Sequence, residues 1–140
     1  MIQANELRIG NWIIQDSMYA KVMALDENEI TIDSYPLRYA AKPAAFDPIP
    51  LTPEILEKCG FKRLYDKSTY PNSAETWSIK VSTDFDHYLS IDIVTGNSEL
   101  ILENFEGSQT FFLPDIEYIH QLQNLYFALT GTELEIKSPL

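Results

Sequence analysis

The sequence contains little cysteine, little glycine and no long hydrophobic run. Cys59 is the only cysteine, which excludes an intrachain disulfide and a zinc site built from several thiolates. The five glycines lie singly and far apart, which excludes a glycine-rich phosphate loop. No apolar run approaches the roughly 20 residues that a membrane-spanning helix needs. Because residues 1–6 also lack the basic and apolar pattern of a signal peptide, we expect a cytoplasmic protein.

Basic residues are scarce in the C-terminal part of the chain. The 140 residues carry a formal net charge of −11. Residues 84–140 contribute −9 of this charge, with Lys137 as their only base, while residues 1–50 contribute −3 and residues 51–83 contribute +1. Proteins that bind nucleic acid attach mainly through Lys and Arg, and a surface of this charge repels phosphate at long range. Direct binding of nucleic acid is therefore disfavoured.

The overall composition is that of one folded domain. Apolar residues make up 45% of the chain and charged residues 22%, and aromatic residues supply bulky side chains for a core. The length is close to the commonest domain size. We expect a single domain over residues 1–140, with a β-rich N-terminal lobe at 1–50 and an α+β lobe at 51–140.

The first third of the sequence predicts a β-meander. Apolar residues alternate with polar ones over 7–14, 19–25 and 30–32, and turn-forming residues separate these runs. Such short strands suit a strongly bent barrel or half-barrel. Residues 36–53 hold five of the eight prolines, which excludes a central strand or a helix interior and predicts an extended crossover.

A short helix and an antiparallel sheet are predicted next. Thr52 is a suitable N-cap, Pro53 suits the first helical position, and Gly60 suits the end of a helix over 54–59. Residues 61–65 form a candidate strand. Further alternating runs predict a hairpin and two more strands, over 77–81, 88–93, 99–102 and 110–113.

The longest helix is expected from Pro114-Asp115 to Thr130, with Gly131 at its end. Its apolar residues recur at spacings of three and four, which predicts one face packed on the sheet, formed by Ile116, Ile119, Leu122, Leu125, Tyr126 and Leu129. Phe111 and Phe127 are expected to extend this core, and residues 133–136 to form a last strand. The predicted fold class is α+β, with the long C-terminal helix packed on an antiparallel sheet.

One acidic segment has the residue types of a metal site. Asp84, Asp86 and His87 lie close together and Asp92 follows, and carboxylates and imidazole are metal ligands. The further ligands and the closing Glu of a calcium loop are missing. We interpret the segment as a solvated hairpin turn, and we predict neither a metal nor a cofactor.

A cysteine nucleophile with a histidine base is the second candidate. Cys59 with His87 or His120 supplies the residue types. Cys59, however, falls at the C-terminal end of its helix, where the dipole disfavours a thiolate. His120 lies among Gln121, Gln123 and Asn124, which indicates a polar helix flank. We therefore predict no catalytic residue and no enzymatic activity.

A basic cluster with interleaved aromatic residues is the third candidate. Its members are Lys58, Lys62, Arg63 and Lys67, together with Phe61, Tyr65 and Tyr70. This pattern can grip single-stranded nucleic acid. The favoured interpretation is a strand whose charged side chains reach water.

Three strings of the sequence resemble one protein family. They are Asn5-Glu6-Leu7-Arg8-Ile9-Gly10-Asn11-Trp12, Ile49–Leu56 followed by Cys59-Gly60-Phe61, and His120-Gln121-Leu122-Gln123-Asn124-Leu125-Tyr126-Phe127-Ala128-Leu129-Thr130-Gly131. The family comprises small uncharacterised proteins encoded in Bacteroides-type genomes and their phages or mobile elements. It has no established activity, so the resemblance implies a genomic context and no site. Residues 7–32 are also similar in outline to the opening strands of SH3-like barrels, which does not determine a function.

Three functions compete on this sequence. The leading hypothesis is a non-enzymatic module that binds a protein partner, from host or phage machinery. The alternative is an acidic inhibitor that imitates nucleic acid and occupies a basic protein, which the charge of residues 84–140 supports. An enzyme is the third hypothesis and has only scattered Asp and His residues behind it.

Overall fold

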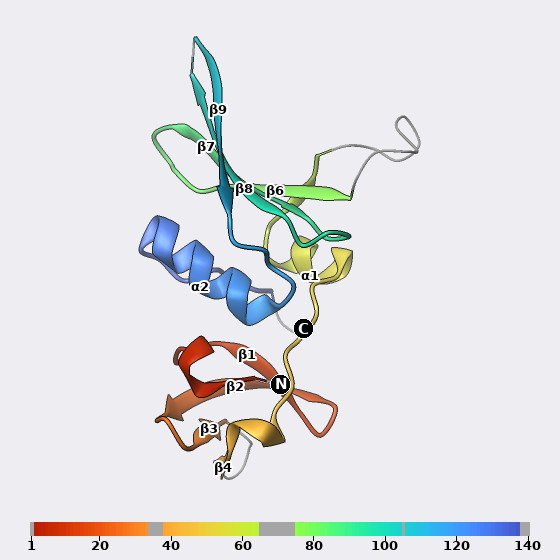
Figure 1. Cartoon of the computed structure of the whole chain (residues 1–140), viewed down its shortest axis with the longest axis vertical. Coiled ribbons are helices and arrows are strands. Elements are labelled where there is room, and N and C mark those ends of the chain that lie inside the picture. The colour runs from red at the N-terminus through yellow and green to blue at the C-terminus, as the bar shows by residue number, and fades with distance from the viewer. Residues whose placement is uncertain (1, 34–37, 65–74, 105, 138–140) are drawn as a thin grey trace. The chain divides into compact units, whose positions relative to one another are not determined.

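A computed structural model of the chain describes residues 2–33, 38–64, 75–104 and 106–137 (Figure 1). The chain forms two compact units. The first unit consists of Met1–Pro50 and Tyr118–Leu125, and the second of Leu51–Glu117 and Tyr126–Leu140. Among the described residues, each unit contains one antiparallel sheet, and two α-helices occur. The α+β class predicted from the sequence is confirmed.

The first unit contains the predicted meander. Its four strands follow one another in the sheet in chain order, and each pair is antiparallel. They are β1 (Trp12–Gln15), β2 (Met18–Leu25), β3 (Ile30–Ile32) and β4 (Tyr39–Ala41). β4 and a 3-10 turn at Pro43–Ala45 lie in the segment that was expected to be only a crossover. That expectation was wrong for β4, because proline is excluded from central strands but not from the surroundings of an edge strand.

A two-residue turn joins β1 to β2 without a glycine. Asp16 has a φ of 49° and Ser17 a φ of 66°. Positive φ at both central positions is the requirement of the type I′ turn, which matches the twist of the flanking strands. Asp tolerates this region better than most residues, whereas Ser has no such preference. The turn therefore holds some backbone strain at Ser17.

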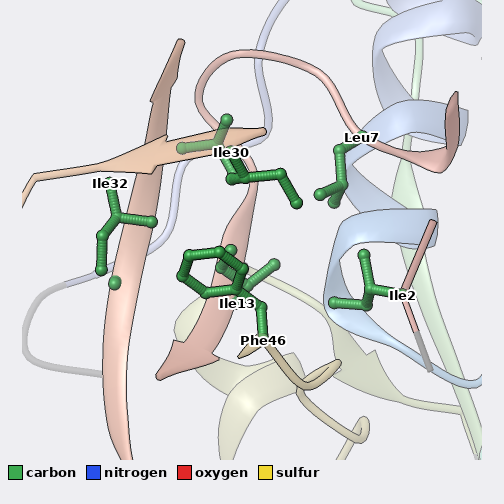
Figure 2. Close-up of a cluster of buried hydrophobic side chains, with 8 residues drawn as sticks. Ile2, Leu7, Ile13, Ile30, Ile32 and Phe46 are labelled. Carbon is green, nitrogen blue, oxygen red and sulfur yellow. The ribbon is translucent and has the colours of Figure 1, made fainter. Parts of the chain in front are cut away.

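The core of the first unit is a cluster of aliphatic side chains around one aromatic ring (Figure 2). The sheet contributes Ile13, Val22, Ile30 and Ile32, all at most 1% exposed. Ile2 and Leu7 come from the N-terminal segment, and Phe46 follows the 3-10 turn after β4. The alternating burial of the strands, seen most clearly in β3, explains why the period of two was readable in the sequence.

The second unit begins with the short helix that the sequence predicts. α1 runs over Pro53–Lys58, and the Thr52 hydroxyl accepts a hydrogen bond of 3.2 Å from the backbone N–H of Ile55. Gly60 follows the helix with a φ of +86°, a conformation that glycine adopts without strain. Local capping therefore determines both ends of α1.

The sheet of the second unit is a five-stranded antiparallel meander. Its strands are β5 (Lys62–Arg63), β6 (Thr76–Lys80), β7 (Asp86–Asp92), β8 (Ser98–Asn104) and β9 (Gly107–Leu113). All five predicted strand regions of this segment are confirmed, and β8 and β9 are longer than expected. In Figure 1 the turn end of the β8–β9 hairpin projects past the other strands of the same sheet. The strand expected at 133–136 was wrong, since these residues have no regular structure.

The long helix begins later than the sequence suggests. α2 runs over Ile119–Thr130, not from Pro114-Asp115. The backbone before it pairs with other segments, because Ile116 N–H donates to the Gly96 carbonyl at 2.7 Å and Leu51 N–H donates to the Glu117 carbonyl at 3.0 Å. These bonds hold the segment extended. The helix can start only where the Gln121 side chain accepts a hydrogen bond from the Tyr118 N–H, at 3.1 Å.

The buried face of α2 differs from the predicted one. Ile119 and Leu122 are fully buried as expected, but His120 and Gln123 are buried beside them. The remaining predicted core residues of the helix, Leu125, Tyr126 and Leu129, are half-buried. Phe111 and Phe127 do not extend the core, because 49% and 39% of their surfaces are exposed.

Candidate functional site

The acidic segment at 84–87 forms the end of the β6–β7 hairpin. β7 begins at Asp86, whose carboxylate lies 3.6 Å from the Lys80 ammonium. The ring of Phe85 stacks on His87 with 5.3 Å between centroids. Among residues 2–33, 38–64, 75–104 and 106–137, no three side chains of His, Cys, Asp or Glu are grouped so that they could hold a metal ion. β6 and β7 pair antiparallel on either side of these residues, so the interpretation of the segment as a hairpin turn is confirmed.

Cys59 is buried at the end of α1, with only 3% of its surface exposed. Burial raises the pKa of its thiol to about 12. The thiolate, which is the nucleophilic form, is therefore scarce at neutral pH. Cys59 is a small apolar core residue in this fold.

His120 is not on a polar flank, as the sequence suggested, but inside the first unit. The side chain is 1% exposed, and its ring stacks on Tyr118 with 5.9 Å between centroids. Nε2 lies 3.4 Å from a carboxylate oxygen of Glu6. Burial lowers the pKa of His120, and the nearby Glu6 opposes this effect. The imidazole is thus held mainly as a neutral core group.

The amide side chains around His120 connect α2 to the start of β1. Gln123 accepts a hydrogen bond of 2.9 Å from the Trp12 N–H and donates one of 3.1 Å to the Gly10 carbonyl. Asn124 accepts bonds of 3.0 Å from both the Asn11 amide and the Arg8 guanidinium. These bonds satisfy polar groups that are buried on folding. We define this set of contacts as the amide network.

The amide network joins two of the strings that carry the family resemblance. One string contains Gly10-Asn11-Trp12 and the other contains His120, Gln123 and Asn124. Their polar residues bond to each other within the first unit. The specific pattern in the sequence thus has a structural use, namely the fixing of α2 on the N-terminal segment.

The basic cluster is only partly within the described residues. Lys62 and Arg63 form β5, whereas Lys67, Tyr65 and Tyr70 lie outside the described ranges. The Arg63 guanidinium bonds to the Glu75 carboxylate at 3.0 Å and lies 5.2 Å from the centre of the Trp77 ring. Phe61 is buried. Arg63 therefore already has an anion and an aromatic face as partners within its own sheet.

A hollow of about 680 Å³ lies in the second unit between the β6–β7 hairpin, β8 and the end of α2. Its walls mix hydroxyl groups with apolar side chains, and the charged or titratable residues among them are Lys80, His87 and Tyr126. Lys80 is paired with Asp86, and the Thr130 hydroxyl donates to the Tyr126 carbonyl at 2.7 Å. The hollow thus lacks converging groups prepared for chemistry.

The exposed sheet edge formed by β9 is the feature that sequence reasoning missed. It has seven residues, and among the strands the structure describes it has a neighbour, β8, on one side only. No residue of Gly107–Leu113 is charged, and the first six are exposed. An edge strand presents unpaired N–H and C=O groups to any other extended chain. β9 therefore offers a row of backbone hydrogen-bonding groups.

Two exposed aromatic rings flank this edge, one on each face of the sheet. Phe111 is 49% exposed and Phe112 is 84% exposed. Successive residues of a strand point to opposite faces, so the two neighbouring rings cover both sides of the same edge. Phe111 pairs with Leu100 across the ladder, and Phe112 pairs with Glu99.

The other sheet edges are short or covered. β4 has three residues and β5 has two. β1 has four residues, and its Ile14 exchanges two backbone hydrogen bonds, of 2.8 and 2.9 Å, with Asp47. Such short or covered edges are the usual protection against unwanted pairing. β9 alone among these described edges is long, uncharged and uncovered.

The two faces at β9 differ in chemistry. The face of Phe112 also carries Thr110 and Ser108 from β9, and Glu99 and Glu103 from β8, by the register of the two strands. We call this the Phe112 face. The opposite Phe111 face continues from Phe111 through Leu100 to Leu89, which pair in register and become progressively more buried. The Phe112 face thus carries two carboxylates, with the half-buried Ile101 between them. The row from Phe111 to Leu89 on the other face is apolar, and the exposed Gln109 lies beside it.

The residues of the exposed edge at β9 were visible in the sequence as a short apolar run. The sequence predicted a strand over 110–113 and placed Phe111 in an extended core, but the strand order that puts this strand at an edge could not be inferred from the local pattern. Within the described part of the chain, no helix is both long and apolar enough to cross a membrane. No family model matches this chain, and neither a curated protein nor a solved structure shows significant similarity to it.

Proposed function

We propose that the protein is a non-enzymatic binding module that captures an extended segment of a protein partner along β9. The observation that carries this proposal is the uncovered seven-residue edge with an exposed Phe on each face. Addition of a strand to an open sheet edge is a common mode of peptide recognition, in which backbone bonds give affinity and side chains give specificity.

The dimensions of β9 suit this mode. Seven residues at about 3.4 Å each span roughly 20 Å, which is the length of an ordinary strand. A partner strand would bond to the backbone of β9 and cover Phe111 and Phe112 from the side. Each ring could bury a large part of its apolar surface, and exposed aromatic residues of this kind are typical binding hot spots.

Charge favours another protein over a second copy of this chain. Residues 84–140 carry −9, and they include both strands of the β8–β9 hairpin. Two copies joined at β9 would bring these charges together at short range. Like charges across an interface cost binding energy and slow encounter. A partner with basic residues is attracted by the same charges.

The resemblance described above supplies the biological setting of the proposal. We propose that the partner belongs to host or phage machinery and that the protein acts in the cytoplasm. The buried Cys59 suits a compartment in which thiols stay reduced.

Capture from a lysate of the source cells, with the full chain as bait, tests the proposal. A partner that binds through β9 is retained by the native chain and lost with Phe112→Lys, because a lysine on the edge blocks close packing. Val94→Lys is the matched control, since Val94 is 75% exposed in the β7–β8 turn of the same unit.

Hydrogen exchange then locates the contact. Addition of the purified partner should slow amide exchange in Gly107–Leu113 at least tenfold, and should leave β4 unchanged. A partner retained by Phe112→Lys, or a partner that protects other segments and not β9, contradicts the proposal.

An acidic mimic of nucleic acid is the second candidate function. On the face that carries Phe112, four carboxylates project from neighbouring strands: Asp86 and Asp92 of β7, and Glu99 and Glu103 of β8. A basic protein could accept them in place of phosphates. Competition decides between the two candidates, because duplex DNA displaces a mimic from its target and leaves a partner bound along β9.

A further inference from the structure

We infer that the segment captured by β9 alternates cationic and apolar side chains, with Lys or Arg on the Phe112 face and aliphatic or aromatic residues on the Phe111 face. This inference rests on the proposed function and specifies the partner's chemistry. It follows from the two different faces that a single added strand must match at once.

Strand geometry sets the alternation. An added strand would lie about 4.8 Å from β9, with successive side chains on opposite faces of the sheet. Every second residue would therefore meet Phe112, Thr110 or Ser108, and every other residue would meet Phe111 or its neighbours. A segment of one polarity throughout would satisfy one face and not the other.

The Phe112 face favours cations for two reasons. Glu103 stands directly behind Ser108 in the ladder, and Glu99 stands behind Phe112. Ser108 is small, so a Lys or Arg opposite it can extend over it toward the Glu103 carboxylate. A cation placed opposite Phe112 can lie on the ring, which is 84% exposed, with Glu99 beyond it.

Among the residues that the structure describes, no cation is paired with the two carboxylates of Glu99 and Glu103. Of the two lysines on the same face of the sheet, Lys80 is paired with Asp86, and Lys62 lies in β5 at the far edge. An incoming cation would therefore not compete with an ion pair from the described part of the chain.

The Phe111 face favours apolar residues. Leu89 is fully buried, Leu100 is half-buried and Phe111 is 49% exposed, and the three are neighbours across the ladder. This row of contacts ends at Phe111 in the free protein. An apolar side chain on the added strand would continue the row and cover the exposed part of the ring.

Two designed peptides test the inference directly. Both have seven residues with Val at alternate positions, and they differ only in having Lys or Glu at the other four. We expect the Lys peptide to bind the full-length protein at least tenfold more tightly than the Glu peptide, measured by fluorescence anisotropy at 0.15 M salt. In Glu99→Gln/Glu103→Gln the preference should fall at least fivefold.

A second double variant controls for general charge attraction. Glu57→Gln/Glu135→Gln removes the same charge from exposed positions outside the sheet, so the preference for the Lys peptide should stay within twofold of the native value. An equal loss in both double variants overturns the inference, because the attraction would then be nonspecific.

The failure of the inference can be separated from that of the proposed function. Equal binding of both peptides, abolished by Phe112→Lys, overturns the cation preference and leaves strand addition standing. Failure of the Lys peptide to bind overturns the inference, and exchange protection of β9 by the captured partner then decides the proposed function independently.

Discussion

The two units of this protein differ in whether the polar groups of their backbone and sheet edges have hydrogen-bonding partners. In the first unit, side-chain amides occupy buried backbone groups, and Asp47 covers the edge at β1. In the second unit, no strand in the described ranges pairs with the outer edge of β9, which is seven residues long. Open edges invite association, so a fold keeps one where association is useful. The difference is that the first unit pairs its buried polar groups internally, whereas the second unit contains the edge that we propose as a binding site.

The same contrast appears in the choice of side chains. The first unit buries His120, Gln123 and Asn11, each at most 3% exposed. The second unit exposes Phe111 and Phe112. A buried polar group and an exposed aromatic pair are both more informative than an ordinary core, because each needs a specific reason. For the buried polar groups the reason is the amide network, and for the exposed aromatic pair we propose docking at β9.

The largest effect is expected from a cavity in α2. Leu122 is fully buried, so Leu122→Ala should lower the free energy of unfolding by about 2–5 kcal/mol. Urea melts measure this change. Leu129→Ala, at a half-buried position of the same helix, should cost less than half as much. Unchanged stability in Leu122→Ala would show that the buried face of α2 is assigned wrongly.

The amide network can be broken at its central residue. Gln123→Met keeps the side-chain volume but leaves the Trp12 N–H and the Gly10 carbonyl without their partner. We expect a loss of about 1–3 kcal/mol in the free energy of unfolding, since unsatisfied buried groups carry this cost. The matched control is Gln109→Met on exposed β9, which should be nearly neutral. Equal effects at the two sites would contradict the contrast between the units.

Acid should weaken the first unit through His120. Its pKa in the folded state is below the usual 6.5, mainly because the ring is buried. Above pH 6.5 both folded and unfolded chains hold it neutral. As the pH falls below 6.5, the unfolded chain takes up a proton first, so stability decreases until the folded-state pKa is passed.

Urea melts between pH 5 and pH 8 test the role of His120. His120→Gln should flatten the acid side of the stability curve. Glu6→Gln should increase the loss of stability in acid, because without Glu6 the pKa of the buried imidazole falls further below its usual value. If the free energy of unfolding of His120→Gln falls with decreasing pH as steeply as that of the native protein, groups other than His120 cause the fall.

The smallest effect concerns the β1–β2 turn, and its sign is stabilising. Ser17 has a φ of 66°, which glycine adopts without strain. Relief of this strain in Ser17→Gly should raise the free energy of unfolding by about 0.5–1 kcal/mol. The conformational entropy that glycine loses on folding reduces this gain. Thermal melts of Ser17→Gly and of Ser17→Ala, which keeps the strain, separate the two contributions.

Local signals in the sequence predicted most of the elements and their class. The Thr52 cap, Pro53 and Gly60 defined α1, and alternation defined the strands of both sheets. The start of α2 was missed because backbone bonds from Ile116 and to Glu117 compete with the helix. Such long-range bonds leave no local pattern. β4 was missed because proline density indicates irregular structure and does not exclude an edge strand.

The candidate site was harder to predict than the fold. Phe111 and Phe112 in a run of apolar residues indicate a buried strand unless the strand order is known. The polar string around His120 pointed to a solvated flank, whereas its amides bond to backbone more than a hundred residues away. In both cases exposure depends on the tertiary partner of the segment, which periodicity does not encode.

The division of α2 between the units has a consequence for synthesis on the ribosome. The first unit needs Tyr118–Leu125 as well as Met1–Pro50, and all 67 residues of Leu51–Glu117 are made in between. The second unit needs Tyr126–Leu140 in the same way. The N-terminal meander is therefore made before Leu51–Glu117 but lacks the helix residues of its amide network until Tyr118–Leu125 have been added. A nascent chain stalled before residue 118 should leave Asn11 and the Trp12 N–H without their helical partners, open to chaperones and proteases.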